Sequence, residues 1–202
     1  MLKAMVFIDM ENFDIAKYNY YKSISTESAV KAPKIDYTKM SQLLVRLSND
    51  NAVLLKTVIF APKPDDFLIN DPIRKAKYDW VKKLNDRNYI SVVEGRHVAR
   101  PSAGFTQTTM NISERNSYYV VEKGTDVNLA ATAISMAASN SFDIAIIVSG
   151  DTDYIPVMDI LSHMGKLVST VCVKNQSISR FKAHSDIQLV LDSSFFNQCS
   201  II

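Results

Sequence analysis

The sequence predicts an α/β fold: a three-layer α/β/α sandwich around a central, mostly parallel sheet of about six strands. Two observations predict it. Aliphatic runs of strand length alternate with longer segments of helical character along the 202 residues. Two of these runs, Val6–Ile8 and Ile144–Val148, are apolar throughout and stop at polar residues, as strands buried on both faces do.

The elements can be placed in order along the chain. The predicted strands are Val6–Ile8, Val53–Phe60, Tyr89–Val93, Ile144–Val148, Leu167–Val173 and Ile187–Leu191, with a further strand-like run at Tyr118–Val121. The predicted helices are Asp36–Leu47, Asp71–Arg87, Asp126–Ala138 and Asp153–Met164. Asp71 is a favourable N-cap, and Pro72 after it suits the first helical turn.

Length and composition indicate one domain. A chain of 202 residues has the size of a single compact domain, so residues 1–202 are interpreted as one unit. Two stretches rich in small polar residues, 20–33 and 101–117, are predicted to be surface excursions from it.

Composition excludes several classes of protein. The net charge of +2 is too small for a polybasic nucleic-acid binder, so contact with a polyanion needs a local patch. Two distant cysteines and three histidines supply neither a disulfide framework nor a structural zinc site. Five glycines leave no glycine-rich phosphate loop, which excludes nucleotide-binding dehydrogenases and P-loop NTPases. The first apolar run ends too early for a signal peptide or a membrane span, so we expect a cytoplasmic protein without a membrane partner.

Four aspartates are the candidate functional residues. Asp9 follows the first strand, Asp151 and Asp153 follow the strand at 144–148, and Asp126 begins a helix. Because ligands of open parallel sheets bind beyond the carboxyl ends of the strands, we expect these side chains to gather at one edge. Gathered carboxylates repel one another unless a cation neutralises them, and oxygen ligands favour Mg²⁺ or Mn²⁺, which indicates metal-assisted hydrolysis of a phosphodiester. Each aspartate taken alone also fits a helix cap or a turn.

Three blocks of sequence around these aspartates point to a family. They are Phe7–Phe13, Lys123–Ala130 and Ser149–Pro156 with Gly165-Lys166 following. In order and chemical type they resemble the NYN domain, the LabA-like branch of the PIN-like nuclease superfamily. The resemblance implies a PIN-like fold and a Mg²⁺- or Mn²⁺-dependent ribonuclease that acts on RNA in single-stranded regions. It also implies a catalytic and metal-binding set made of Asp9, Asp126, Asp151 and Asp153.

Candidate substrate contacts surround this set. Asn12 and Ser149 match family positions near the site and are predicted to orient ligands or phosphate. Two sets of basic residues are predicted to meet RNA phosphates, with ordinary solvated charges as the alternative. The first follows or flanks predicted strand ends and consists of Lys63, Arg96, His97, Arg100 and Lys123, and the second follows the strand at 167–173 and consists of Lys174, Arg180, Lys182 and His184.

The sequence departs from the family at one position. Members often carry an acidic residue six places after the position of Asp126, where this chain has Thr132. Because a threonine hydroxyl adds no negative charge, we expect lower metal affinity or altered activity.

Two rival functions remain open at this point. A catalytically weak NYN domain would serve as an RNA-binding or protein-interaction module. A haloacid-dehalogenase-type phosphatase would need a second aspartate where this chain has Glu11. The sequence also leaves the oligomeric state open, a homodimer included.

Overall fold

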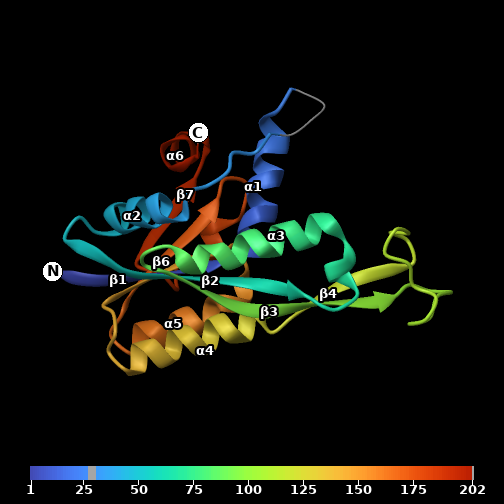
Figure 1. Cartoon of the computed structure of the whole chain (residues 1–202). Coiled ribbons are helices and arrows are strands. Elements are labelled where there is room, and N and C mark those ends of the chain that lie inside the picture. Colours follow the sequence, from blue (N-terminus) through green and yellow to red (C-terminus); the bar gives the residue numbers. More distant parts are fainter. Residues whose placement is uncertain (27–30, 202) are drawn as a thin grey trace.

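The structure is a computed structural model that describes residues 1–26 and 31–201, and within them the chain forms one seven-stranded sheet flanked by six α-helices (Figure 1). The strands are β1 (Leu2–Asp9), β2 (Ala52–Pro64), β3 (Ile90–Pro101), β4 (Tyr118–Lys123), β5 (Ile144–Val148), β6 (Leu167–Val173) and β7 (Ile187–Leu191). The helices are α1 (Met10–Ile24), α2 (Tyr37–Ser48), α3 (Pro72–Lys82), α4 (Thr125–Ala138), α5 (Ile155–His163) and α6 (Ser193–Cys199).

The sheet has the strand order β4-β3-β2-β1-β5-β6-β7. The six strands predicted from the sequence run parallel to one another. The strand-like run at 118–121 becomes β4, which pairs antiparallel with β3. The prediction of an α/β fold with a mostly parallel sheet is therefore confirmed, with seven strands in place of about six.

The centre of the sheet is β1, whose residues Ala4 to Ile8 are almost completely buried. Side chains of successive residues point to opposite faces of a strand. Ala4, Val6 and Ile8 accordingly belong to one core cluster, whereas Met5 and Phe7 belong to the other. A strand that is apolar on both faces reads as a continuous hydrophobic run, which is why the sequence identified it.

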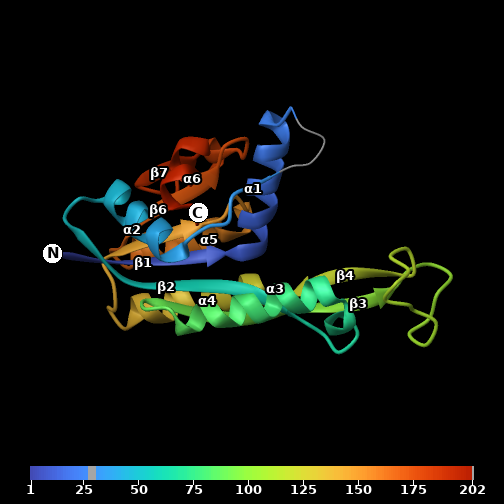
Figure 2. The same cartoon turned by 45° about the horizontal axis from the view of Figure 1, so that its top comes forward.

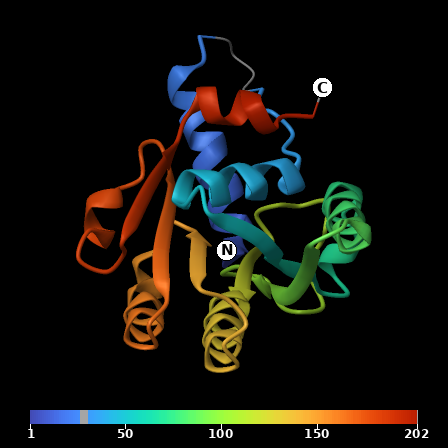
Figure 3. The same ribbon diagram turned by 90° about the vertical axis from the view of Figure 1, so that its left-hand side faces the viewer.

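The helices form one layer on each face of the sheet. The cluster around Val6 includes Phe13 of α1, Leu44 of α2, Val81 of α3 and Phe196 of α6. The opposite cluster includes buried side chains of α4 and α5. In Figure 3, α4 and α5 lie on one face while α1, α2 and α6 gather on the other.

Two helices were not predicted from the sequence. Helix α1 begins directly after β1, where the Asp9 carboxylate accepts a hydrogen bond from the Asn12 backbone N–H. It continues to Ile24 because Phe13, Ala16 and Tyr20 form a buried stripe at helical spacing. The excursion predicted at 20–33 therefore begins only after Ile24, and its residues 27–30 lie outside the described part of the chain. Helix α6, near the C-terminal end, was also missed.

Strands β3 and β4 form a hairpin that projects beyond the rest of the sheet (Figures 1 and 2). The predicted strand at 89–93 is much longer than expected, because β3 continues to Pro101 along β4. Residues 102–117 connect the two strands without a helix or strand. Across the described residues, no helix combines the length and the apolar character needed to cross a lipid bilayer.

Candidate functional site

The carboxyl edge of the sheet brings three of the four predicted aspartates together. Strands β1 and β5 are parallel neighbours, and the chain order reverses between them, which is where open α/β sheets form their ligand crevice. Asp9 ends β1, Asp151 follows β5 by three residues, and Asp126 lies in the first turn of α4. The three line one hollow of about 400 Å³, here called the acidic hollow.

Tyr154 holds two of these carboxylates in place. Its buried hydroxyl lies 2.8 Å from Asp126 Oδ1 and 3.1 Å from Asp9 Oδ2, so its single proton serves one carboxylate at a time. Burial and the two nearby carboxylates raise the pKa of the Tyr154 hydroxyl, which therefore stays protonated. The tyrosine thus sets the separation of Asp9 and Asp126.

Asp9 is the most enclosed member of the set, with a residue exposure of 5%. Burial raises the pKa of its carboxyl, and repulsion from Asp126 and Asp151 adds to the rise. The hydrogen bonds from the Asn12 N–H and the Tyr154 hydroxyl act in the opposite direction. A bound cation would offset the repulsion that raises the pKa of Asp9.

Asn12 and Ser149 have structural partners around the acidic hollow. The Asn12 side-chain oxygen accepts hydrogen bonds from the Gly150 N–H (3.0 Å) and from Gln176 Nε2 (3.1 Å). A side chain at position 150 would displace the Gln176 amide, which is hydrogen-bonded to Asn12. Ser149 Oγ lies 3.4 Å from Asp9 Oδ2 and accepts from the Asp151 N–H. Both side chains therefore position the aspartates.

Asp153 lies at the rim of this region. It is exposed and is not among the residues that line the acidic hollow. Its backbone N–H donates to Asp151 Oδ1 at 3.0 Å, so Asp151 caps the short 3₁₀ turn at 152–154. Asp153 therefore lies beside Asp151, outside the lining of the acidic hollow.

Of a second group in the same hollow, sequence reasoning named His97 as a candidate phosphate contact and missed Glu11 and Glu122 as site residues. One ligand atom each from Glu11, His97 and Glu122 lies within 4.8 Å of the others, and His97 Nε2 is 2.7 Å from Glu11 Oε2. Burial raises the pKa of Glu122 to about 8, with hydrogen bonding to Glu11 as the next cause. Burial also acts to raise the pKa of Glu11, but the hydrogen bonds from His97 and Glu122 outweigh it and lower the pKa to about 2. Glu122 thus keeps a proton that Glu11 has lost.

The register of the β3–β4 hairpin explains which of its residues reach the hollow. His97 stands opposite Glu122, and Arg96 stands opposite Lys123. Since neighbouring residues in a strand point to opposite faces, His97 and Glu122 line the acidic hollow while Arg96 and Lys123 do not. Lys174 lines an adjoining hollow that shares Asn12 with the acidic one.

Thr132 lies away from the site. It is half-buried on α4 and does not line the acidic hollow. Six residues beyond Asp126 correspond to a rise of about 9 Å and a turn of roughly 240° around the helix. An acidic residue at this position would therefore not face the three aspartates.

Arg74 of α3 contributes a positively charged side chain to the lining of the acidic hollow. Arg74 lies within the helix predicted at 71–87, and it lines the hollow together with the carboxylates. Its Nε is buried without a hydrogen-bond partner among the described residues and lies 3.8 Å from Asp71 Oδ2. Asp71 in turn caps α3, as predicted, by accepting from the Ile73 and Arg74 N–H groups.

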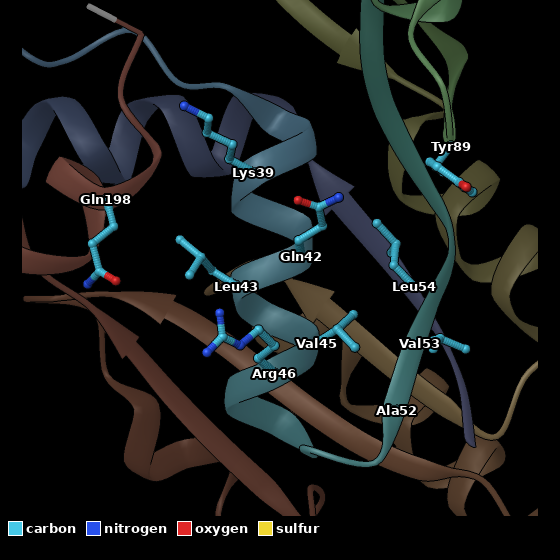
Figure 4. Close-up of a pocket in the computed structure, with 10 residues that line it drawn as sticks. All are labelled: Lys39, Gln42, Leu43, Val45, Arg46, Ala52, Val53, Leu54, Tyr89 and Gln198. Atoms are coloured by element: carbon cyan, nitrogen blue, oxygen red, sulfur yellow. The ribbon is translucent and has the colours of Figure 1, made fainter. Parts of the chain in front are cut away.

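A wider hollow lies at the opposite edge of the sheet, between α2 and the first residues of β2 (Figure 4). It measures about 810 Å³ and is lined by Lys39, Arg46 and Tyr89 together with apolar and amide side chains. None of the described residues that line it is a carboxylate or a histidine, which are the groups that bind a cation. The chemistry therefore favours the smaller acidic hollow as the functional site.

The acidic hollow has the oxygen chemistry of a site for a hard divalent cation. Asp9, Asp126 and Asp151 offer oxygen ligands, which Mg²⁺ and Mn²⁺ prefer, and Asp9 is repelled by the other two in the absence of a counter-charge. Among the described residues, however, only Glu11, His97 and Glu122 bring their ligand atoms within 4.8 Å of one another, so they form the tightest candidate ligand group in the hollow. The remaining width of the hollow leaves space for water and for a phosphate oxygen beside the ion.

Comparisons with known proteins agree with this arrangement. The family model of the NYN domain matches residues 3–192 of the chain. The fold is similar to the crystal structure of a protein of unknown function from Vibrio parahaemolyticus, with a TM-score of 0.57 and 15% sequence identity, over 99% of this chain and 96% of that chain. At this identity the similarity shows the fold alone. No curated protein matches the chain.

Proposed function

The chain belongs to the NYN domain family, a PIN-like nuclease family, and from this premise we propose that it is a Mg²⁺- or Mn²⁺-dependent ribonuclease. The observation that carries the proposal is the convergence of Asp9, Asp126 and Asp151 in one hollow at the carboxyl edge of β1 and β5. These three residues come from three separate parts of the chain, so their meeting is a property of the fold.

Asp9, Asp126 and Asp151 would hold the cation, with Asp153 as a fourth acidic residue at the rim. When bound, the ion would supply an activated water and neutralise charge on the scissile phosphate. Tyr154 keeps Asp9 and Asp126 apart at a fixed separation, and Asn12 and Ser149 hold the loop that carries Asp151. Pre-set ligands of this kind avoid reorganisation when substrate arrives.

The residues that would contact RNA are Arg74 in the acidic hollow and Lys174 in the hollow beside it. Both would meet backbone phosphates, which position RNA without reading its sequence. Arg96 and Lys123, on the outer face of the hairpin, would contribute to the general attraction of RNA to this end of the molecule.

The experiment is metal-dependent cleavage of single-stranded RNA by wild type and by Asp151→Asn, which keeps the side-chain shape and removes its charge. We expect the variant to lose cleavage, because its charge acts on the ion and not on the core. Asp153→Asn measures the contribution of the rim residue. Asp66→Asn, at an exposed aspartate outside the acidic hollow, is the matched control and should cleave as wild type does.

Three other outcomes would contradict the proposal in different ways. RNA that is bound but not cut in Mg²⁺ and Mn²⁺ would indicate an RNA-binding module. Release of phosphate from small phosphomonoesters would indicate a phosphatase. Cleavage that survives in Asp151→Asn would place the reaction elsewhere.

A further inference from the structure

A small hollow adjoins the acidic hollow on the side of α3. Its apolar wall consists of Met10, Ala61, Pro62, Pro64, Tyr78 and Val81. It shares Glu11, Arg74 and His97 with the acidic hollow, so the two are continuous. We call it the side hollow. A mostly apolar pit with a few polar groups at one end is the usual form of a site for a small organic group.

The size of the side hollow sets the size of its occupant. Its volume is about 130 Å³. This is less than half the roughly 300–1,000 Å³ of a site for a drug-sized ligand, so the space suits a small occupant of roughly ten non-hydrogen atoms. That is the size of one nucleobase, whereas a whole nucleotide is about twice as large. The polar end opens toward the carboxylates, where a sugar and phosphate would continue.

Tyr78 gives the side hollow a fixed aromatic wall. Its hydroxyl donates to Glu94 Oε1 at 2.7 Å, and this bond holds the ring in place. Burial and the hydrogen bond to Glu94 raise the pKa of the hydroxyl to about 12, so the bond persists at neutral pH. Proteins that read single-stranded RNA stack unpaired bases on aromatic side chains.

Arg74 stands where the two hollows meet. Its buried Nε has no hydrogen-bond partner among the described residues, and the closest acidic oxygen, on Asp71, is 3.8 Å away. The other lysine or arginine at the side hollow, Lys77, already pairs with Asp14 at 3.0 Å. Arg74 therefore has donor capacity left for a base edge or a phosphate.

We propose that the side hollow receives one unstacked base of single-stranded RNA, while the phosphate next to that base lies among the carboxylates of the acidic hollow. The inference rests on the proposed ribonuclease function and adds the way in which the substrate is held. An unpaired base can enter such a pit, but a base within a duplex cannot, so the site selects single-stranded RNA.

The test measures binding of short fluorescent single-stranded RNA, and of a strand of equal length that has the same sugars and phosphates without bases. Ala61→Leu fills the side hollow, Tyr78→Ala removes the aromatic wall, and Tyr78→Phe keeps the ring without the hydroxyl. We expect Ala61→Leu and Tyr78→Ala to weaken RNA binding roughly tenfold and to leave binding of the base-free strand unchanged, as loss of one stacked base does. Tyr78→Phe should weaken RNA binding less than Tyr78→Ala does, because it keeps the ring and loses only the bond to Glu94.

Tyr89→Ala is the matched control, because Tyr89 is an exposed tyrosine at the opposite edge of the sheet. Thermal unfolding of each variant establishes that it folds. If Ala61→Leu does not fold, the comparison of Tyr78→Ala with Tyr78→Phe tests the inference. Equal binding of RNA and base-free strand by wild type, or unchanged RNA binding by folded Ala61→Leu and Tyr78→Ala, overturns the inference.

Cleavage assays separate this inference from the proposed function. RNA cleavage that depends on Asp151 but is unaffected in Tyr78→Ala would support the ribonuclease function and contradict base binding in the side hollow. Base-dependent binding that is lost in Tyr78→Ala, in a protein that cuts no RNA, would support base binding in the side hollow and contradict the ribonuclease function.

Discussion

Tyr154 is the residue on which the geometry of the acidic hollow depends most directly. Its hydroxyl is within hydrogen-bond distance of both Asp9 and Asp126, and the residue is 1% exposed. The hydroxyl is a buried donor between two carboxylates that repel each other, and its hydrogen bonds offset part of that repulsion.

Tyr154→Phe removes only this hydroxyl. We expect the free energy of unfolding in metal-free buffer to fall by about 2 kcal/mol, the usual contribution of a hydrogen bond to a charged group. Urea denaturation with a chelator present measures it, and Tyr119→Phe, at an exposed tyrosine, serves as the control. A Tyr154→Phe variant as stable as wild type would show that the carboxylates do not need the tyrosine.

Glu122 makes the stability of the metal-free protein depend on pH. Its pKa is about 8 in the folded chain, against an ordinary value of 4.5, so the folded state keeps a proton that the unfolded state has lost. Stability should therefore decrease as the pH rises from about 4.5 to about 8. Glu11 has the opposite sign: its pKa of about 2 adds stability above about pH 4.5 that is lost as the pH falls toward 2.

The variant that checks this is Glu122→Gln. We expect it to lose less stability than wild type between about pH 5 and pH 8, because glutamine has no proton to release. Denaturation curves at several pH values in the presence of a chelator measure the difference. Glu114→Gln, at an exposed glutamate in the loop 102–117, should follow the wild-type curve.

Among the elements, α3 connects the site to the rest of the fold. Asp71 caps its first turn and also pairs with Arg115 of the loop 102–117 at 3.1 Å. The same carboxylate lies 3.8 Å from Arg74 Nε. One buried aspartate therefore orients the helix, the loop and the Arg74 side chain at the acidic hollow.

Asp71→Ala removes the cap and leaves two arginines without their partner. We expect a loss of about 1–2 kcal/mol in the free energy of unfolding, as for other N-cap replacements. Asp71→Asn should recover most of it, since asparagine caps helices as well as aspartate does. Thermal or urea unfolding compares the three proteins, and equal losses in both variants would mean that charge, and not capping, is what Asp71 contributes.

For the whole molecule, the proposed cation couples ligand binding to folding. A ligand that binds only the native state raises the melting temperature. We therefore expect Mn²⁺ to raise the melting temperature of wild type and to have little effect on the Asp9→Asn/Asp151→Asn variant. In metal-free buffer that variant should be at least as stable as wild type, because it lacks part of the mutual repulsion. The same Mn²⁺ shift in both proteins would place the cation elsewhere.

The sequence by itself determined the features that depend on local pattern. Central strands such as β1 and β5 are buried on both faces and read as unbroken apolar runs, and Asp71 reads as an N-cap because capping involves only the next turn. From the direction of parallel strands it followed that Asp9 and Asp151 lie at one edge.

Only the tertiary structure decided which further side chains meet there. Glu122 and His97 reach the acidic hollow because the antiparallel register of β3 and β4 turns them inward and turns Lys123 and Arg96 outward. That register is set by pairing between distant segments and leaves no local signal in either strand. Arg74 likewise has no local signal that marks it as a site residue, and it is the packing of α3 beside β2 that brings it to the carboxylates.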